Sequence, residues 1–178
     1  AGSLTVYGGD ISIANNVTIA KTTGGDAELN LNATDNIRFG SDVTISATVG
    51  ALNVTLRTDS DESYGNGEIY INPRSSIATN GGDIVFGGGS NPEYGSARSN
   101  YGDGIVLSES SLDAQGGDIS LRGDGGFEGS GVRLYNSTVA TTSSGRIDIK
   151  GSQGLALHSS TLSTQNGAIW LTGSDFGG

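Results

Sequence analysis

A guanidinium and a carboxylate flank a single glycine in the tripeptide Arg122-Gly123-Asp124. In an exposed loop, such a tripeptide can bind integrin-type receptors through its two charged groups. Short motifs also arise by chance in Gly-rich loops, and this chain contains 31 glycines. Both interpretations stay open. A loss of cell adhesion on Asp124→Glu substitution would support receptor binding, and unchanged adhesion would remove it.

Three acidic residues, Asp59, Asp61 and Glu62, lie close together in the sequence. Hard oxygen ligands of this kind bind Ca²⁺ in proteins. The tandem Ca²⁺-binding nonapeptide, Gly-Gly-x-Gly-x-Asp-x-apolar-x, is absent from the sequence, however. A solvated acidic loop is therefore the alternative to a Ca²⁺ site, and no cofactor is predicted.

Trp170 and His158 are the two remaining single side chains with recognisable chemistry. Trp170 stands between Ile169 and Leu171, so its ring is expected to point outward, where it could stack on a sugar or be covered by a neighbour. The chain has one histidine and no cysteine, so it offers almost no residues from which the familiar nucleophilic triads could be built. His158 is accordingly predicted to be a surface residue.

Four Asn-x-Ser/Thr sequons could accept N-linked glycans. Several such sequons are expected by accident in a chain rich in Asn, Ser and Thr. They begin at Asn16, Asn32, Asn53 and Asn136.

The elements that must position these side chains are strands. Apolar residues recur at every second position, as in Leu52-Asn53-Val54-Thr55-Leu56, which is the period of a strand and not of a helix. No long window shows helical apolar spacing, and Thr, Ser, Asn, Asp and Gly are mediocre to poor helix formers. Almost no helix is predicted.

The strands belong to a repeat that is clearest in residues 104–171, where it occurs three times. Extended backwards, the repeat predicts equivalent first-strand positions at Ile11, Ile37, Ile69, Ile105, Val132 and Leu155. The predicted third-strand positions are Ala27, Leu52, Ile84, Ile119, Ile147 and Ile169. A partial preceding copy is predicted at residues 4–6.

The length variation of the repeat is predicted to lie at one corner. The spacing between successive first-strand positions is longest from Ile69 to Ile105 and shortest from Val132 to Leu155, whereas the predicted first-to-third spacing is nearly constant in every copy. The extra residues therefore fall between a third strand and the next first strand. They are residues 57–67, 87–103 and 122–130.

A repeat of 20 to 40 residues with three short strands and no helix is typical of a β-solenoid. We predict an all-β, right-handed parallel β-helix of about six three-stranded coils, the hand following the general rule for parallel crossovers. Gly-Gly-Asp before the third strand suits a corner. Asp83 and Asp118 should be neighbours in one corner column, where turn capping is the preferred explanation of two adjacent like charges.

The predicted outward positions give no catalytic carboxylate pair, so no enzyme is predicted. Those of the first strand are Ser12, Arg38, Tyr70, Val106, Arg133 and Ala156. Those of the third strand are Glu28, Asn53, Val85, Ser120, Asp148 and Trp170. Both sets are also too mixed for the flat Thr array of an ice-binding solenoid.

The chain of 178 residues suits one domain and carries a net charge of −10. That charge repels phosphate and anionic lipid, so no nucleic-acid partner is expected, and no apolar run is long enough for membrane insertion. Neither residues 1–3 nor residues 174–178 look like an amphipathic cap. We therefore expect residues 1–178 to be a single solenoid segment of a longer fibre.

Gly-Gly-Asp-Ile-x-Leu, followed by Gly-Val-x-Leu-x-x-Ser-x-Val-x-Thr, resembles the repeat region of filamentous-haemagglutinin-like exoproteins over most of the chain. These are adhesins exported by two-partner secretion. The resemblance implies a secreted or bacterial cell-surface location and no catalysis. It also implies an outer-membrane secretion partner for the parent chain. The Asn-Pro-Asn-Gly-type motifs of the family's secretion domain are absent from this sequence.

Two functions follow from these observations. The first is a structural and adhesive segment that attaches to a host or neighbouring cell surface through a glycan or protein receptor. The alternative is a carbohydrate-active β-helix, resembling a polysaccharide lyase or glycosidase, with its site at the insertion corner.

Overall fold

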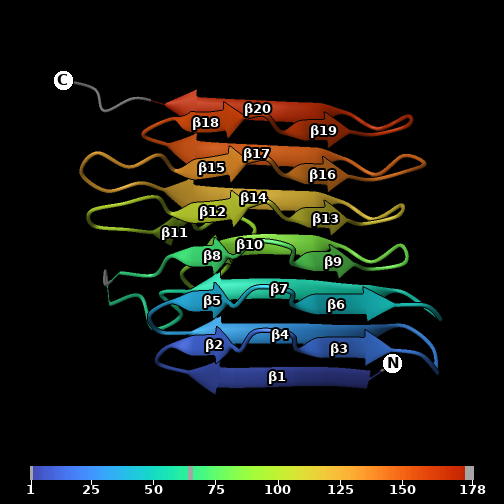
Figure 1. Ribbon diagram of the computed structural model, residues 1–178. Helices are drawn as coiled ribbons and strands as arrows, with labels where there is room; N and C mark the ends of the chain where they lie inside the picture. The colour runs from blue at the N-terminus through green and yellow to red at the C-terminus, as the bar shows by residue number, and fades with distance from the viewer. Residues whose placement is uncertain (1, 64–65, 175–178) are drawn as a thin grey trace.

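The computed structural model describes residues 2–63 and 66–174 and consists of parallel strands in three stacked sheets. The described residues contain no helix, and so no helix that is long and apolar enough to cross a membrane. Figure 1 shows the coils stacked from the N-terminal strand to the C-terminal strand. The predicted all-β parallel solenoid is confirmed. The stack has about seven turns, because a lone strand precedes six three-stranded coils.

Each coil contributes one strand to each sheet. The long sheet contains β1 (Gly2–Gly8), β4 (Ala27–Ala33), β7 (Leu52–Thr58), β10 (Ile84–Gly88), β14 (Ile119–Asp124), β17 (Ile147–Ser152) and β20 (Ile169–Ser174). The first-strand sheet contains β2 (Ile11–Ile13), β5 (Ile37–Phe39), β8 (Ile69–Ile71), β12 (Ile105–Ser108), β15 (Val132–Tyr135) and β18 (Leu155–His158). The second-strand sheet contains β3 (Thr18–Lys21), β6 (Thr44–Ala47), β9 (Ser76–Ala78), β13 (Ser111–Asp113), β16 (Thr138–Ala140) and β19 (Thr161–Ser163).

The core consists of the inward side chains of the strands between the two ends of the stack, together with Val106, an outward position of β12 that is nevertheless buried. Strands β5, β7 and β14 alternate between buried and more exposed residues, as their sequence alternation predicts. Phe39 and Phe86 are fully buried, together with the inward Ile, Val and Leu side chains of the middle coils. Burying one such side chain stabilises the fold by about 1.5–3 kcal/mol. The stacked apolar columns therefore supply the main driving force for the fold.

The first-strand register is as predicted. Ile37 pairs with Ile11 and with Ile69, and the same column continues through Ile105, Val132 and Leu155. The strand at residues 4–6 is also confirmed, because β1 pairs with β4 and places Leu4 beside Leu29.

The third-strand register differs from the prediction in the first two coils. Leu52 pairs with Ala27 as expected, but Ile84 pairs with Val54 and not with Leu52. The true column therefore begins at Leu29 and Val54, one inward position later than predicted. Such a shift leaves the same side chains facing inward, so the alternation cannot reveal it. The first two coils are therefore longer than the later coils at a second place, the corner between the second and third strands.

The three large insertions lie at the predicted corner, on the left of the stack in Figure 1. The connection from third strand to next first strand is longest between Ile84 and Ile105 and short between Ile147 and Leu155. The second insertion also contributes β11 (Ala97–Arg98), which pairs with the end of β14. Residues 64–65 of the first insertion lie outside the described part of the chain.

Side-chain oxygens tie one corner to the next coil. The Asp83 carboxylate accepts a hydrogen bond from the Asp118 backbone amide at 2.7 Å, and the Asp118 carboxylate accepts one from the Arg146 amide at 2.7 Å. Asn53 accepts the Asp83 amide in the same way at 3.0 Å. Asp83 and Asp118 are thus neighbours in one column that caps the turns, as predicted.

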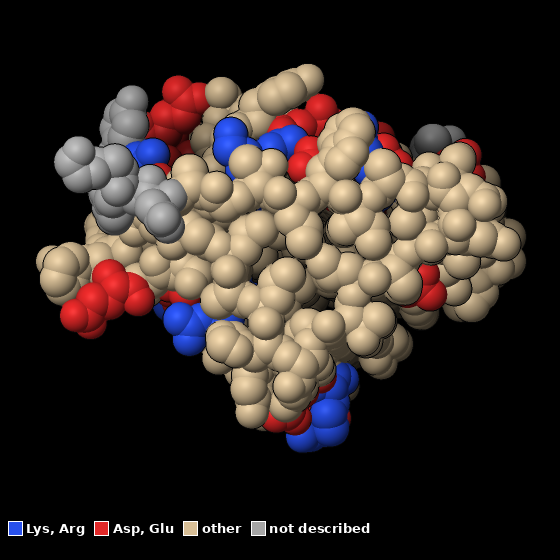
Figure 2. All heavy atoms as spheres, turned by 90° about the horizontal axis from the view of Figure 1, so that it is seen from above, with Lys and Arg blue, Asp and Glu red and all other residues tan. Residues whose placement is uncertain are grey.

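The two ends of the stack expose apolar residues that the middle coils bury. Leu4 in β1 is 57% exposed and Leu171 in β20 is 47% exposed, because within the described residues each of these strands has a neighbouring strand on one side only. Viewed onto the C-terminal coil, Lys, Arg, Asp and Glu lie mainly at the margins and uncharged residues fill the middle (Figure 2). That the chain is a segment of a longer fibre stays a prediction, and residues 1 and 175–178 lie outside the described part.

Candidate functional site

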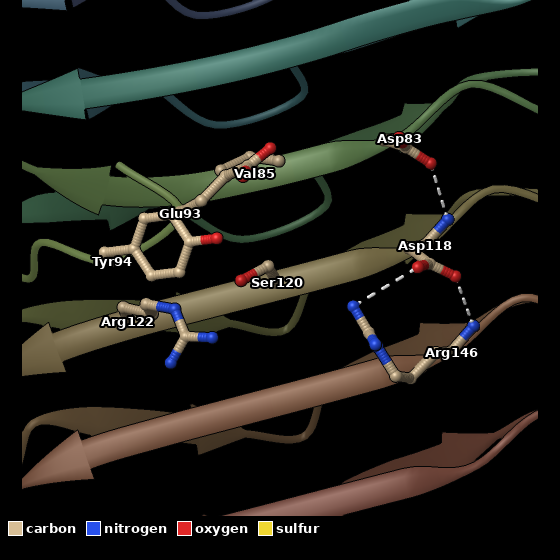
Figure 3. A pocket seen from close by; sticks show the side chains of 8 residues that line it. All are labelled: Asp83, Val85, Glu93, Tyr94, Asp118, Ser120, Arg122 and Arg146. Carbon is tan, nitrogen blue, oxygen red and sulfur yellow. Dashed lines mark hydrogen bonds and ion pairs between the residues drawn. The ribbon is translucent and has the colours of Figure 1, made fainter. Parts of the chain in front are cut away.

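A hollow lined mainly by charged and polar side chains lies on the outer face of the long sheet, over β10, β14 and β17. We call it the sheet groove; its volume is about 160 Å³. Figure 3 shows carboxylate, guanidinium, hydroxyl and aromatic groups converging on it. The lining residues are Asp83, Val85, Glu93, Tyr94, Asp118, Ser120, Arg122 and Arg146.

Glu93 and Tyr94 reach the groove because residues 89–95 of the second insertion fold back as a flap. The Asn91 side chain accepts the Glu93 amide at 3.0 Å, and the Asn91 carbonyl accepts the Gly95 amide at 2.7 Å. The Gly88 amide in turn donates to the Gly95 carbonyl at 3.1 Å. These hydrogen bonds close the flap into a compact turn.

Glycine is required where the flap meets its own strand. A Cβ atom built on Gly95 would overlap the Gly88 carbonyl oxygen, and one built on Gly87 would overlap the Pro92 carbonyl oxygen. The two backbones therefore touch with no room for a side chain. Arg57 anchors the flap from the coil below through a hydrogen bond to the Ser90 carbonyl at 3.2 Å. Backbone contacts thus set the position of Tyr94.

The floor of the groove is formed by outward side chains that lie next to one another because their strands pair in register. Val85, Ser120 and Asp148 are consecutive outward neighbours in β10, β14 and β17. Arg122 lies one outward position further along β14 and donates to the Asp148 carboxylate at 2.8 Å. Both side chains of this pair are largely buried, so the ion pair fixes the position of the Arg122 guanidinium in the groove.

Arg146 closes the other side of the groove. Its guanidinium lies 3.4 Å from the Asp118 carboxylate and 5.0 Å from the centre of the Trp170 ring. Trp170 points outward as predicted, but Arg146 covers part of its face, which is the cation–π arrangement. The Tyr94 hydroxyl points toward the side of the groove where Asp118 and Arg146 lie (Figure 3).

A second hollow continues the groove toward the N-terminal coils. It shares Asp83, Val85 and Glu93 with the first, and the flap lies between the two. Its other lining residues are Glu28, Asn30, Asn53 and Thr55. We call these two adjoining hollows together the channel; their lining residues run along the long sheet from Glu28 in β4 to Arg146 beside β17, with Glu93 of the flap between the hollows.

Arg122-Gly123-Asp124 lies in β14 and not in the exposed loop expected for it. Gly123 pairs with Ala97 on one side and with Gly151 on the other. The Asp124 carboxylate is 3.1 Å from Arg98, while Arg122 pairs with Asp148. Strand pairing therefore holds the backbone of Gly123 and Asp124 on both edges, and both charged groups of the tripeptide are engaged in ion pairs.

The three candidate Ca²⁺ ligands do not converge. Asp59 is buried, Glu62 is exposed, and the Asp61 carboxylate accepts the Ser63 amide at 3.3 Å. Asp59 and Glu62 share a small hollow with Arg98, and Asp61 does not line it. Within the described residues, no three His, Cys, Asp or Glu side chains are grouped closely enough to hold a metal ion.

The sequons and the histidine are scattered over the stack. Asn16, Asn53 and Asn136 are exposed, whereas Asn32 is 9% exposed. The Asn53 side chain is used at the corner, where its oxygen accepts the Asp83 amide. His158 is an exposed residue at the end of β18, as predicted, and lies away from the sheet groove in the column of Tyr135.

The insertions form a second surface beside the groove, which we call the outgrowth (residues 57–63, 66–67, 96–104 and 124–131). The Gly67 and Arg98 backbones exchange two hydrogen bonds, at 2.6 and 3.1 Å. The Phe127 amide donates to the Asn100 carbonyl at 3.0 Å, so three insertions from successive coils are joined. Tyr101 and Phe127 stand on the outgrowth, 82% and 71% exposed.

The repeat pattern in the sequence did not reveal the acidic side of the groove. It placed Glu28 and Asn53 in the column of Val85, whereas the observed register puts Asn30 and Thr55 there and aligns Asn53 with Asp83 and Asp118. Glu93 and Tyr94 were missed because a loop's fold-back leaves no periodic signal. The Gly-Gly-Gly at residues 87–89 was the one hint of a close backbone contact there.

The groove offers hydrogen-bond donors, acceptors and an aromatic ring to a polar ligand. In comparisons with known proteins, no family model, no curated protein and no solved structure matches the chain.

Proposed function

We propose that this chain is a structural and adhesive segment of a secreted β-helical exoprotein of the bacterial cell surface. The stack of coils provides length and rigidity, and the insertions on one side provide a contact surface for a glycan or protein receptor on a host or neighbouring cell. Export of the parent chain through an outer-membrane secretion partner belongs to the same proposal.

The observation that carries this proposal is the outgrowth with its adjoining flap. Three insertions from successive coils are joined by backbone hydrogen bonds and leave Tyr94, Tyr101 and Phe127 between 71% and 82% exposed. Exposed aromatic side chains held on a rigid scaffold are typical of recognition surfaces. Their place on one side of a regular stack favours contact with a partner over a purely structural role.

Attachment of coated beads to cultured cells tests the proposal. Beads carrying the chain should attach, and beads carrying the triple variant Tyr94→Ala, Tyr101→Ala and Phe127→Ala should attach severalfold less. Tyr135→Ala is the matched control, because Tyr135 is an exposed aromatic residue of β15 outside the insertions. Equal attachment of the wild type, the triple variant and bare beads would refute the adhesive role.

One observation favours the carbohydrate-active alternative. The sheet groove brings Asp83, Glu93 and Asp118 beside Arg122 and Arg146, which is the combination of acidic and basic groups that sugar-cleaving enzymes use. Asp118 is already paired with Arg146, however, and Asp83 with the Asp118 amide. Incubation with polysaccharides should therefore release neither reducing ends nor ultraviolet-absorbing products; release of either would establish the enzyme.

A further inference from the structure

We infer that the sheet groove and its continuation bind a neutral, extended oligosaccharide. This assignment rests on the proposed adhesive function and deepens it by naming the class of ligand and the face of the stack that receives it. The shape of the channel, the chemistry of its lining and the balance of its charges all point to such a ligand.

The channel has the shape of a site for a linear chain. Its two hollows share Asp83, Val85 and Glu93, and together they reach from Glu28 in β4 to Arg146 next to β17. The strands crossed are β4, β7, β10, β14 and β17, which gives a length of roughly 19 Å at about 4.8 Å between neighbouring strands. This length suits several linked sugar rings and exceeds the size of one ring.

The lining matches a ligand covered with hydroxyl groups. Carboxylates and amide oxygens accept hydrogen bonds, and the Ser120 and Thr55 hydroxyls both donate and accept them. Tyr94 adds an apolar ring face that is 81% exposed, against which the C–H face of a sugar can pack. The flap holds this ring over the sheet before any ligand arrives, which lowers the entropy cost of binding.

The charges of the channel favour a neutral ligand over an acidic one. Arg122 is paired with Asp148, and Arg146 with Asp118 and the Trp170 ring, so both cations of the first hollow are already engaged. In the described part of the chain, Glu28 and Glu93 have no ion-pair partner. These carboxylates, together with the net charge of −10, repel uronic acids and sulfated sugars.

Isothermal titration calorimetry with defined oligosaccharides tests the inference. The probes are short neutral oligomers of glucose, xylose, galactose and N-acetylglucosamine, compared with oligogalacturonate and heparin fragments. We expect at least one neutral oligomer to bind, and Tyr94→Ala to weaken its binding about tenfold. Tyr94→Phe, which keeps the ring, should retain binding. Tyr135→Ala is the matched control, because Tyr135 is an exposed aromatic residue of β15 in the first-strand sheet and lines neither hollow.

Glu93→Gln separates the charge argument from the stacking argument. This variant keeps the hydrogen-bonding shape and removes one negative charge, so it should bind the neutral oligomer within about twofold of the wild type and bind acidic fragments more tightly. Circular dichroism and thermal unfolding of each variant verify that the fold is unchanged.

Three results would overturn the inference: no neutral oligomer binds, acidic fragments bind more tightly than neutral ones, or Tyr94→Ala and Tyr135→Ala have equal effects. The adhesive role is judged separately. If beads attach to cells and no neutral oligomer competes, adhesion stands and the ligand class is wrong. If a neutral oligomer binds and beads do not attach, the ligand class stands and adhesion is wrong.

Discussion

Single side chains in this protein are used mostly to join one coil to the next. Asp83 and Asp118 are like charges in adjacent coils, yet each carboxylate accepts a backbone amide from the coil that follows it. Arg74 and Asp42 join coils in a different way, through two hydrogen bonds of 2.7 and 2.6 Å between their side chains. Polar residues of the corners therefore have structural roles that compete with any role in binding.

The Arg74–Asp42 pair gives a prediction about pH. The hydrogen bonds and charge of Arg74 hold the pKa of Asp42 below its usual value. A lowered carboxyl pKa means that the pair stabilises the fold at neutral pH and that this contribution is lost as the pH falls through the lowered pKa. The contribution is small, because both side chains are exposed.

Arg74→Gln should raise the pKa of Asp42 toward the usual value for an aspartate, as measured by NMR titration of the side-chain carboxyl carbon. Asp10 is the internal control. Its pKa is lowered by hydrogen bonds from Asn36, which the substitution leaves in place. An unchanged Asp42 titration would mean that the ion pair does not form in solution.

Asp124→Asn tests the role of the Arg-Gly-Asp tripeptide. The substitution removes the ion pair with Arg98 and should lower the free energy of unfolding by about 1 kcal/mol or less, as is usual for partly exposed pairs. Cell attachment should not change, because the tripeptide is a paired strand whose charges are engaged. Lost attachment with an unchanged melting temperature would show instead that Asp124 contacts the receptor directly.

The elements that decide the site are the corners. The strands of the long sheet resemble one another and pair in a regular register. The corner after the third strand varies, because it is short between Ile147 and Leu155 and much longer between Ile84 and Ile105. The longest of these corners forms both the flap over the sheet groove and β11 in the outgrowth. The candidate binding surfaces thus lie where the repeat is interrupted.

Gly95→Ala tests the flap as an element. A Cβ at this position overlaps the Gly88 carbonyl, so the flap should shift away from the sheet and carry Tyr94 with it. We expect neutral oligosaccharide binding to fall at least as far as in Tyr94→Ala, with only a small loss of global stability. Gly89→Ala is the comparison inside the same loop, because a Cβ there meets no atom within 4 Å, although its φ of +69° adds some backbone strain. Binding unaffected by Gly95→Ala would show that the flap does not position Tyr94.

The whole molecule is a one-dimensional stack, in which each coil is stabilised chiefly by its two neighbours. Middle coils have neighbours on both sides and bury their apolar residues fully, whereas β1 and β20 each have one neighbour and expose theirs. The local stability should therefore rise from the ends of the stack to its centre.

Two substitutions that shorten an apolar side chain to alanine compare the stability of the central coils with that of the end coils. Ile105→Ala, at a fully buried position of β12, should lower the free energy of unfolding by about 2–5 kcal/mol. Leu157→Ala, at a 38% exposed position of β18, should cost clearly less because solvent already reaches that side chain. Chemical denaturation measures both. Equal losses of unfolding free energy would mean that the end coils contribute as much to stability as the central coils, against the expectation.

The sequence by itself determined the strand type, the inward and outward faces, the first-strand column and the corner that carries the large insertions. These features depend on a period of two and on repeat spacing, and both are local properties of the chain. Hence the alternation alone was enough to assign Ile105 and Ile119 to the core, where both are fully buried.

Only the tertiary structure decided the register at Val54, the fold-back of Tyr94 and the strand position of Arg122-Gly123-Asp124. A shift by one inward position preserves every inward side chain, so the alternation is blind to it and corner packing sets it instead. The flap is likewise fixed by contacts between backbone atoms at Gly88 and Gly95, which leave no periodic signal in the sequence. The groove exists because these non-local contacts bring a loop onto the face of a sheet whose strands the sequence had already specified.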